Sequence, residues 1–316
     1  MGKASRTKVD SSRREKIAAQ RAAARRAEQR RRILIAGGSI LAVIIVIVAF
    51  IVVKANSGSS KPAATTSSAN GPTGSALASV VAKVKSVPAS TLNSVGVGGG
   101  AVSGTPQTIK GSAAALTSGG KPEMLYMGAE YCPYCAAERW AMIVALNQFG
   151  TFSGLATVHS GIKDGAGEAE PDPNTPTWTF VNAKYTSKYL AFTPVEMQTN
   201  IPDASNGSYT TLQTPTAAQN ALIDKYDVAP YTTETGAIPF IDFGNKYLVI
   251  GASYDPGVLA GLSWSTIATD LSNPSSPVAQ AVDGTANYIT AAICKMTGNQ
   301  PASACTSAVQ SLESKI

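Results

Sequence analysis

The fold of this chain can be predicted from one segment, Glu130-Tyr131-Cys132-Pro133-Tyr134-Cys135. An apolar run at 124–129 precedes it, and a helical pattern follows at 136–149. The two cysteines therefore lie where a predicted strand gives way to the first turn of a predicted helix. Pro133 suits the first helical position, because the N–H group that proline lacks would have no partner there.

The two cysteines are placed for thiol–disulfide chemistry. The start of a helix carries a partial positive charge and free N–H groups, so we expect Cys132 to lose its proton well below the usual thiol value of about 8.5. Cys135 follows one turn later, where its sulfur can form a disulfide with that of Cys132. Half of a zinc site or a structural disulfide would have the same spacing. The chain offers one histidine and two distant cysteines as further zinc ligands, so the pattern favours redox chemistry.

The surrounding sequence predicts an α/β core. A strand at 124–129, a helix at 133–149 and a strand at 155–158 imply a right-handed crossover and a parallel pair of strands. The stretch 161–215 is long and begins with polar and acidic residues. We interpret it as an insertion after the second core strand, either plain surface structure or a lid or substrate-binding patch near the cysteines.

Further elements follow from apolar spacing and turn residues. We expect helices at 77–87, 216–226, 256–271 and 277–296, and a short strand near 108–110. Thr216 is the predicted cap of its helix. Residues 236–251 predict a β-hairpin that turns at Gly244-Asn245, with Pro239 at the start of its first strand.

The basic charge of the chain is confined to its start. The formal net charge is +6, and residues 1–32 hold 12 of the 26 Lys and Arg but only 3 of the 20 Asp and Glu. The rest of the chain therefore has a net charge of −3, which argues against nucleic-acid binding by the folded part. We interpret the arm 1–32 as a signal that sets membrane topology.

Residues 33–53 predict a transmembrane helix. These 21 residues carry no charge, and at 1.5 Å per residue they span about 31 Å, close to the thickness of the hydrocarbon core of a bilayer. The arginines just before them keep the arm in the cytoplasm and send the rest outside. A cleaved signal peptide is the alternative, but the apolar core of a signal peptide is typically shorter than this run. Residues 54–76 predict a flexible linker, so 77–316 would be an extracytoplasmic domain anchored to the cell membrane.

The motifs of residues 77–316 resemble those of a known family. The segment 129–135 resembles the active-site turn of thioredoxin-like proteins, and Ile238-Pro239 is similar to their cis-proline loop. With 185–190 as a further motif, the exported part is similar to a membrane-anchored thioredoxin-like family catalogued as domain of unknown function 929. The resemblance implies an α/β thioredoxin-like fold with an insertion after the second core strand.

The resemblance also implies roles for the site residues. Cys132 would be the exposed nucleophile, and Cys135 would resolve the mixed disulfide. Pro239, following a cis peptide bond, would lie across the disulfide, and the backbone of Ile238 would pair with a bound substrate chain. Substrate contacts are further implied for Tyr131, Pro133 and Tyr134. No cofactor and no metal are implied.

One position departs from the thioredoxin pattern. Thioredoxins have a buried carboxylate on the strand before the motif, and this chain has Tyr126 there. Glu130 and Glu138 are the nearest carboxylates, and we expect both to face solvent. The usual proton acceptor for the resolving thiol is therefore missing.

The remaining cysteines and the histidine favour structural roles. Cys294 and Cys305 are expected to pair in an oxidising exterior, and so short a loop would stabilise the fold by about 2–3 kcal/mol. The alternative is a relay pair that exchanges with Cys132 and Cys135. His159 is the only histidine, and we expect it to be structural.

The leading hypothesis is a single-pass membrane protein that makes, breaks or rearranges disulfides in other exported proteins. An unidentified redox partner would restore its cysteines. Two alternatives stay open. One is a non-catalytic thioredoxin-like binding module whose Cys132–Cys135 disulfide is structural. The other is a Cu(I)-handling domain that uses the same cysteines, although the 6 methionines form no methionine-rich tract.

Overall fold

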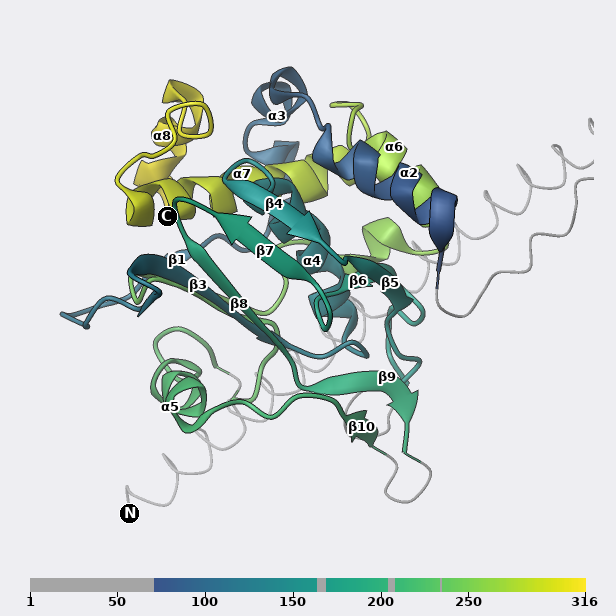
Figure 1. Ribbon diagram of the computed structural model, residues 1–316, viewed down its shortest axis with the longest axis horizontal. Helices are drawn as coiled ribbons and strands as arrows, with labels where there is room; N and C mark the ends of the chain where they lie inside the picture. The colour runs from purple at the N-terminus through teal and green to yellow at the C-terminus, as the bar shows by residue number, and fades with distance from the viewer. Residues whose placement is uncertain (1–70, 164–168, 204–207, 234) are drawn as a thin grey trace, which may run out of the picture. The chain divides into compact units, whose positions relative to one another are not determined.

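A computed structural model describes residues 71–163, 169–203, 208–233 and 235–316 (Figure 1). The predicted basic arm, the predicted transmembrane helix and most of the predicted linker lie outside these residues. Within the described ranges, no helix combines the length and the apolar character that crossing a bilayer requires.

The centre of the fold is a mixed β-sheet. Its strands are, in spatial order, β1 (Gln107–Thr108), β12 (Tyr247–Ile250), β11 (Phe240–Phe243), β3 (Lys121–Gly128) and β8 (Ala191–Glu196). β3 and β8 run parallel, and the other neighbours are antiparallel. The short strand β2 (Thr117–Ser118) pairs with the start of β3. The central strand β3 thus leads directly into the Cys-x-x-Cys segment.

Helices cover both faces of this sheet. They are α4 (Pro133–Leu146) and α7 (Pro277–Thr297) on one face and α5 (Ala217–Tyr226) on the other (Figure 1). Because side chains alternate along a strand, Met124 and Tyr126 pack in the core that contains α4 and α7. Leu125 and Met127 pack on the opposite face with Tyr226 of α5. β3 is therefore buried on both sides, as its continuous apolar run predicts.

Shorter helices pack around α4 and α7. They are α2 (Gly74–Lys85), α3 (Ala89–Val95), η1 (Gly98–Gly100), η2 (Pro256–Leu259), α6 (Trp264–Asp270), α8 (Ser307–Leu312) and η3 (Glu313–Lys315). The single helix predicted at 256–271 is wrong, because η2 and α6 replace it. Gly261 has a φ of +70° between them, and the Ser263 side chain accepts a hydrogen bond from the N–H of Thr266 to start α6.

Most of the other predicted helices are confirmed. The helix at 77–87 corresponds to α2, and those at 133–149, 216–226 and 277–296 correspond to α4, α5 and α7. Thr216 caps α5 as predicted, with its hydroxyl accepting the N–H of Gln219 at 3.2 Å. The hairpin is formed by β11 and β12, and both turn residues, Gly244 and Asn245, have positive φ.

The prediction for the parallel neighbour of β3 is wrong. β5 (Ala156–His159), which covers the predicted strand, pairs antiparallel with β6 (Pro176–Thr179) outside the main sheet. β8 takes the parallel position instead, in register over 123–128 and 191–196. The range 161–215 is therefore not an insertion after the second core strand, because it contains that strand. Both runs favour β-structure locally, and the sequence does not show which one pairs with a distant strand.

Two further antiparallel pairs lie outside the main sheet. β4 (Gly150–Ser153) pairs with β7 (Lys184–Ser187), and β9 (Gln198–Pro202) pairs with β10 (Tyr209–Thr211), both antiparallel. β9 follows β8 directly, so it carries the chain from the edge of the main sheet toward the Cys-x-x-Cys segment.

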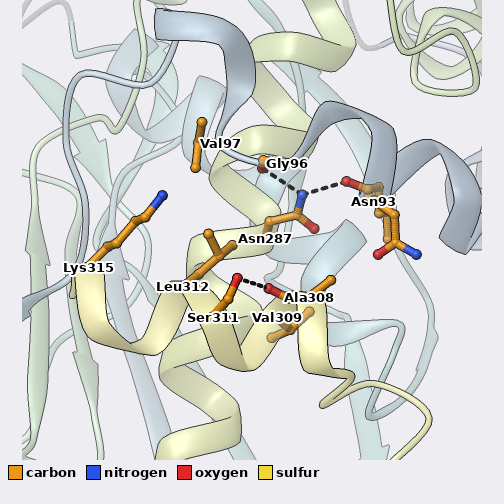
Figure 2. Close-up of a pocket in the computed structure, with 10 residues that line it drawn as sticks. Asn93, Gly96, Val97, Asn287, Ala308, Val309, Ser311, Leu312 and Lys315 are labelled. Atoms are coloured by element: carbon orange, nitrogen blue, oxygen red, sulfur yellow. Dashed lines mark hydrogen bonds between the residues drawn. The ribbon is translucent and has the colours of Figure 1, made fainter.

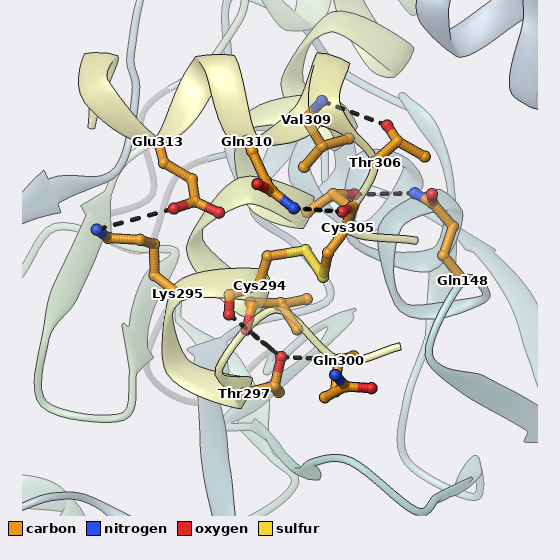
Figure 3. The surroundings of a disulfide bond; sticks show 12 residues. Gln148, Cys294, Lys295, Thr297, Gln300, Cys305, Thr306, Val309, Gln310 and Glu313 are labelled. Atoms are coloured by element: carbon orange, nitrogen blue, oxygen red, sulfur yellow. Dashed lines mark hydrogen bonds and ion pairs between the residues drawn. A yellow bond between two sulfur atoms is a disulfide. The ribbon is translucent and has the colours of Figure 1, made fainter. Parts of the chain in front are cut away.

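The predicted pairing of Cys294 with Cys305 is confirmed by a disulfide between them (Figure 3). Their Cα atoms lie 5.6 Å apart, and both residues are buried. Cys294 belongs to the last turns of α7, and Gly298 ends that helix in the left-handed conformation. The bond thus fastens the segment before α8 to the end of α7.

Candidate functional site

Cys132 is the N-cap residue of α4, as the sequence predicts. Its backbone is extended, Pro133 occupies the first helical turn, and its sulfur accepts the N–H of Cys135 at 3.2 Å. Cys132 and Cys135 are both free thiols. The sulfur of Cys132 therefore meets one of the N–H groups that a helix start leaves unpaired.

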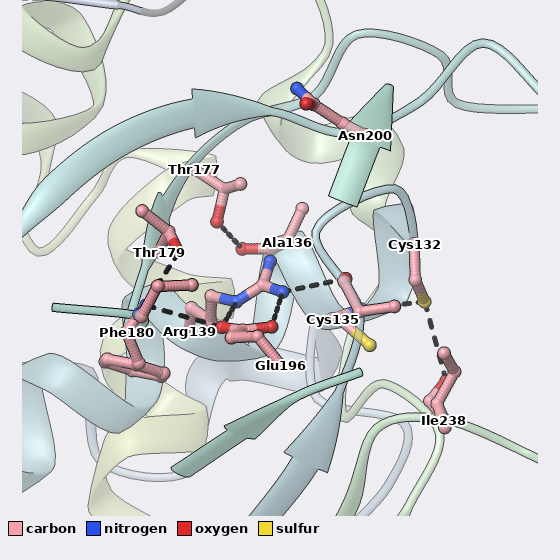
Figure 4. Close-up of polar contacts among 12 residues, drawn as sticks. Cys132, Cys135, Ala136, Arg139, Thr177, Thr179, Phe180, Glu196, Asn200 and Ile238 are labelled. Atoms are coloured by element: carbon pink, nitrogen blue, oxygen red, sulfur yellow. Dashed lines mark hydrogen bonds and ion pairs between the residues drawn. The ribbon is translucent and has the colours of Figure 1, made fainter. Parts of the chain in front are cut away.

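The expectation that Cys132 is exposed is wrong. Only 4% of this residue is exposed, and Cys135 is fully buried. The cause is the loop before β11: the Cys132 thiol points at the carbonyl oxygen of Ile238, with a sulfur–oxygen distance of 3.6 Å (Figure 4). Pro133 is buried too, whereas Tyr134 is 41% exposed. Within 132–135, Tyr134 is thus the exposed residue.

The loop with Ile238 and Pro239 lies across from Cys132, as the resemblance implies. The peptide bond between these two residues is cis. Asp227, at the end of α5, holds this loop in place. Its carboxylate accepts the N–H groups of Gly236 and of Ala237, the latter at 3.2 Å. The position of the Ile238 carbonyl thus depends on a contact made by α5.

Tyr131 is engaged within the protein. Its ring stacks on that of Tyr209, with centroids 4.4 Å apart and planes 7° apart. Its carbonyl oxygen accepts the N–H of Gly161 at 2.6 Å, and the hydroxyl of Tyr209 donates to the carbonyl of Lys163 at 2.8 Å. Parts of the range 161–215 therefore pack directly on the Cys-x-x-Cys segment.

Acidic residues lie near the exposed Tyr134. Partial burial raises the pKa of its hydroxyl, and the charges of Glu170 and Asp172 raise it further. Asp255, at the start of η2, adds to this effect and also raises the pKa of Asp172, after burial. Three carboxyl groups therefore lie close enough to Tyr134 to act on its hydroxyl.

A buried ion pair that the sequence analysis missed lies to one side of the thiols (Figure 4). Arg139 donates to both carboxylate oxygens of Glu196, from Nε at 2.9 Å and from Nη2 at 2.6 Å. Nη2 also donates to the carbonyl oxygen of Ala129 at 2.7 Å, and both charged side chains are fully buried. The pair ties α4 to β8. Nothing local in the sequence indicates the pair, because Glu196 lies 57 residues after Arg139.

The expectation that Glu130 and Glu138 face solvent is wrong. Glu138 is fully buried, and its carboxylate accepts the N–H and the hydroxyl of Ser253, each at 3.0 Å. Burial raises the pKa of Glu138 to about 7. Glu130 is 8% exposed, and burial raises its pKa as well. Both acids become buried through contacts with segments that are distant in the sequence, which the local sequence does not show.

Tyr126 occupies the position where thioredoxins have a carboxylate. It is fully buried, and its hydroxyl has no hydrogen-bond partner among the described residues. The Arg139 guanidinium lies 5.7 Å from the centre of its ring. Burial raises the pKa of Tyr126 well above its usual value, as it does the pKa of the Cys135 thiol.

His159 is half-buried, and its ring meets the edge of Trp264 with centroids 4.5 Å apart. For metals, the thiols are the ligands that this site could offer. In the ranges that the structure describes, no three His, Cys, Asp or Glu residues form a group that could hold a metal ion.

A pocket of about 260 Å³ lies elsewhere, between α3, α7 and α8 (Figure 2). The amide of Asn287 at its wall donates to the carbonyls of Leu92 and Gly96, both at 2.8 Å. No residue that lines it belongs to the surroundings of the thiols. It is therefore separate from the candidate site.

Taken together, the fold and the site define a mixed α/β protein with a Cys-x-x-Cys pair at the start of a buried helix. A family model described as "Domain of unknown function (DUF929)" matches residues 107–295. The match covers more than half of the chain, so the protein belongs to this family. It includes the whole main sheet and both thiols. No curated protein and no solved structure matches the chain.

Proposed function

We propose that this protein is a membrane-anchored thiol–disulfide oxidoreductase that acts outside the cytoplasm on exported proteins. Its domain would have the thioredoxin-like fold. The strand order β8-β3-β11-β12, with one parallel pair next to two antiparallel ones, supports this. So does the place of the thiols, between the central strand and the helix that packs on it.

One observation carries the proposal. The Cys132 sulfur accepts the N–H of Cys135 at the start of α4 while it faces the Ile238 carbonyl. The first contact stabilises a thiolate, which is the nucleophile in disulfide exchange. The second places the backbone carbonyl of Ile238 beside that sulfur, where an extended substrate chain could hydrogen-bond once it displaces the thiol.

The exchange takes two steps. The Cys132 thiolate attacks a substrate disulfide, so a Cys132–substrate disulfide forms and one substrate sulfur leaves as a thiolate. The Cys135 thiolate then attacks the Cys132 sulfur, which forms the Cys132–Cys135 disulfide and releases the second substrate thiolate. The substrate gains two electrons, and the two thiol protons of the protein pass to the substrate sulfurs. Run in reverse, the same steps oxidise a substrate dithiol.

The burial of Cys132 sets a condition on this reaction. A substrate sulfur must approach past the Ile238 carbonyl, so we infer that the loop ahead of β11 shifts when a substrate binds. The acidic residues near Tyr134 favour substrates with positive charge close to their cysteine. The membrane anchor itself rests on the uncharged run at 33–53.

Trapping of the mixed disulfide tests the proposal. In the full-length protein, Cys135→Ala removes the resolving thiol, so covalent adducts with exported proteins should accumulate and be released by a reducing agent. Cys132→Ala is the matched control, because it keeps the other cysteine and should trap nothing. If Cys135→Ala forms no adducts, or if both variants form the same ones, the proposal is wrong.

The burial of Cys132 also favours a second candidate, a binding module whose Cys132–Cys135 disulfide is structural. The reduction potential of the pair separates the two. An exchanging pair should equilibrate with glutathione or thioredoxin buffers, whereas a structural one should have a potential below about −300 mV.

A further inference from the structure

The hydroxyl group of Tyr126 is an unexplained feature of the site. A buried polar group without a hydrogen bond is uncommon in native proteins and requires a physical reason. The Tyr126 ring is well held, with an edge contact to Phe180 at 5.5 Å between centroids. Its hydroxyl nevertheless contacts no acceptor within hydrogen-bonding geometry among the described residues.

Gly128 shows what this hydroxyl lies beside. A Cβ atom on Gly128 would collide with the Tyr126 hydroxyl and would lie 3.0 Å from the sulfur of Cys135. The two groups therefore converge on the same small space, which the missing side chain of Gly128 leaves open. Gly128 does not have a positive φ, so the glycine is needed here for space and not for backbone conformation.

The sulfur of Cys135 needs a partner during disulfide exchange. In either direction of the reaction it carries a negative charge, first as attacking thiolate or last as leaving group. Burial disfavours that charge and raises the pKa of the thiol, while the guanidinium of Arg139 acts in the opposite direction. A nearby hydrogen-bond donor would stabilise the charge further.

We propose that the hydroxyl of Tyr126 donates a hydrogen bond to the thiolate of Cys135 whenever exchange forms it. This inference rests on the proposed oxidoreductase function. Tyr126 keeps its own proton throughout, which agrees with the raised pKa of its hydroxyl. In the resolving step, the bond between Cys132 and the substrate sulfur breaks and the Cys132–Cys135 bond forms. The proton that Cys135 gave up passes to the released substrate thiolate.

The contact can be measured without any exchange reaction. In full-length Cys132→Ser protein in detergent, the ¹³Cβ resonance of Cys135 reports its ionisation as the pH is raised. Adding Tyr126→Phe removes only the hydroxyl, so the midpoint should rise by about one to two pH units. Tyr226→Phe is the matched control: its hydroxyl is also buried and without a partner among the described residues, but it belongs to the core on the α5 face. It should leave the midpoint unchanged.

Kinetics give the second measurement. Tyr126→Phe should slow release of the mixed disulfide about 10- to 100-fold at neutral pH and shift its pH profile to higher pH. In a Cys135→Ala background it should leave the rate of adduct formation at Cys132 unchanged. An unchanged Cys135 midpoint, or equal effects of Tyr126→Phe and Tyr226→Phe, would overturn the proposal. Absence of adducts would instead count against the oxidoreductase function, and the titration would still test the contact.

A measurement on the native tyrosine covers the case in which Tyr126→Phe does not fold. In Cys132→Ser protein, the ¹³Cζ resonance of Tyr126 should shift with the same midpoint as the ¹³Cβ resonance of Cys135. Two independent midpoints, or a Tyr126 resonance that does not respond, would show that the two groups are not in contact.

Discussion

Arg139 and Glu196 are the two opposite charges that packing of β8 against α4 buries together. Such a pair contributes little net stability, but loss of one partner leaves an uncompensated charge in the core. We expect Glu196→Gln to lower the free energy of unfolding by about 3–5 kcal/mol, measured by denaturant unfolding of the full-length protein in detergent. The double variant Arg139→Met with Glu196→Gln should recover most of this loss. If the double variant is as unstable as Glu196→Gln, the unpaired charge is not the cause.

Asp283 makes stability depend on pH. It is fully buried in α7, and its two oxygens have no hydrogen-bond partner in the described part of the chain. Burial raises its pKa from 3.8 to about 8, so the folded protein keeps a proton that the unfolded chain has lost. The stability that comes from protonated Asp283 is therefore fully present below the unfolded pKa of 3.8 and is lost as the pH rises to about 8. Between these values the free energy of unfolding falls by up to about 1.4 kcal/mol per pH unit.

We therefore expect Asp283→Asn to stabilise the protein relative to the native chain at pH 8 more than at pH 5. Unfolding in denaturant at both pH values measures this. Asp224→Asn, at an exposed position of α5, should show no such difference. Glu138 and Asp242, whose pKa values burial raises to about 7, add slopes of the same sign that remain in every variant. Equal gains at the two pH values would contradict the prediction.

At the level of elements, we expect Asp227, at the end of α5, to limit access to the thiols. Its carboxylate holds the loop that places the Ile238 carbonyl against the Cys132 sulfur. Asp227→Ala removes two charge-assisted hydrogen bonds, so the loop should open more often. We expect alkylation of Cys132 by iodoacetamide to become about 10-fold faster or more.

Asp224→Ala is the control for this prediction, because it removes the same charge from an exposed position on the same helix. It should leave the alkylation rate unchanged. If Asp227→Ala reacts no faster than the native chain, then the loop does not limit access, and the burial of Cys132 has another cause.

How far the sequence predicts each element depends on whether its determinants are local. The helix α5 was predictable because Thr216 and the apolar spacing act within a few residues, and the turn at Gly244-Asn245 because its dihedral preferences are local. The placement of Cys132 at the start of α4 follows from local rules too. The parallel partner of β3 does not follow from local rules. Both β5 and β8 favour β-structure, and tertiary packing decides which of them pairs with β3.

The candidate site was likewise predictable only where its determinants are local. Its thiols and the Ile238-Pro239 loop follow from short motifs. Its buried charges do not, because Glu138 and Arg139 become buried only through contacts with Ser253 and Glu196, which are distant in the sequence. Exposure of Cys132 was wrongly predicted for the same reason, since its sulfur is shielded by residue 238.

At the level of the molecule, the Cys294–Cys305 disulfide is a different pair from the free thiols of Cys132 and Cys135. Replacing both cysteines by serine should lower the free energy of unfolding by about 2–3 kcal/mol, since a short closed loop constrains the unfolded chain. Release of the mixed disulfide by Cys135 should keep its rate. Cys132→Ser is the control for the stability measurement, because it removes a sulfur that does not belong to this disulfide. If the serine pair instead abolishes re-oxidation or re-reduction of Cys132 and Cys135 by a redox partner, the disulfide is a relay.

The long separation between β3 and the strands that flank it has a consequence for biosynthesis. A ribosome makes the chain from its N-terminus, so residues 132 and 135 are synthesised before β8 and well before β11. During that interval neither sulfur is shielded by the rest of the fold, and small oxidants can reach both as freely as in a peptide. The interval ends when residue 238 has been made and its carbonyl has reached the sulfur of Cys132, so the nascent chain is exposed to oxidation that the folded protein resists.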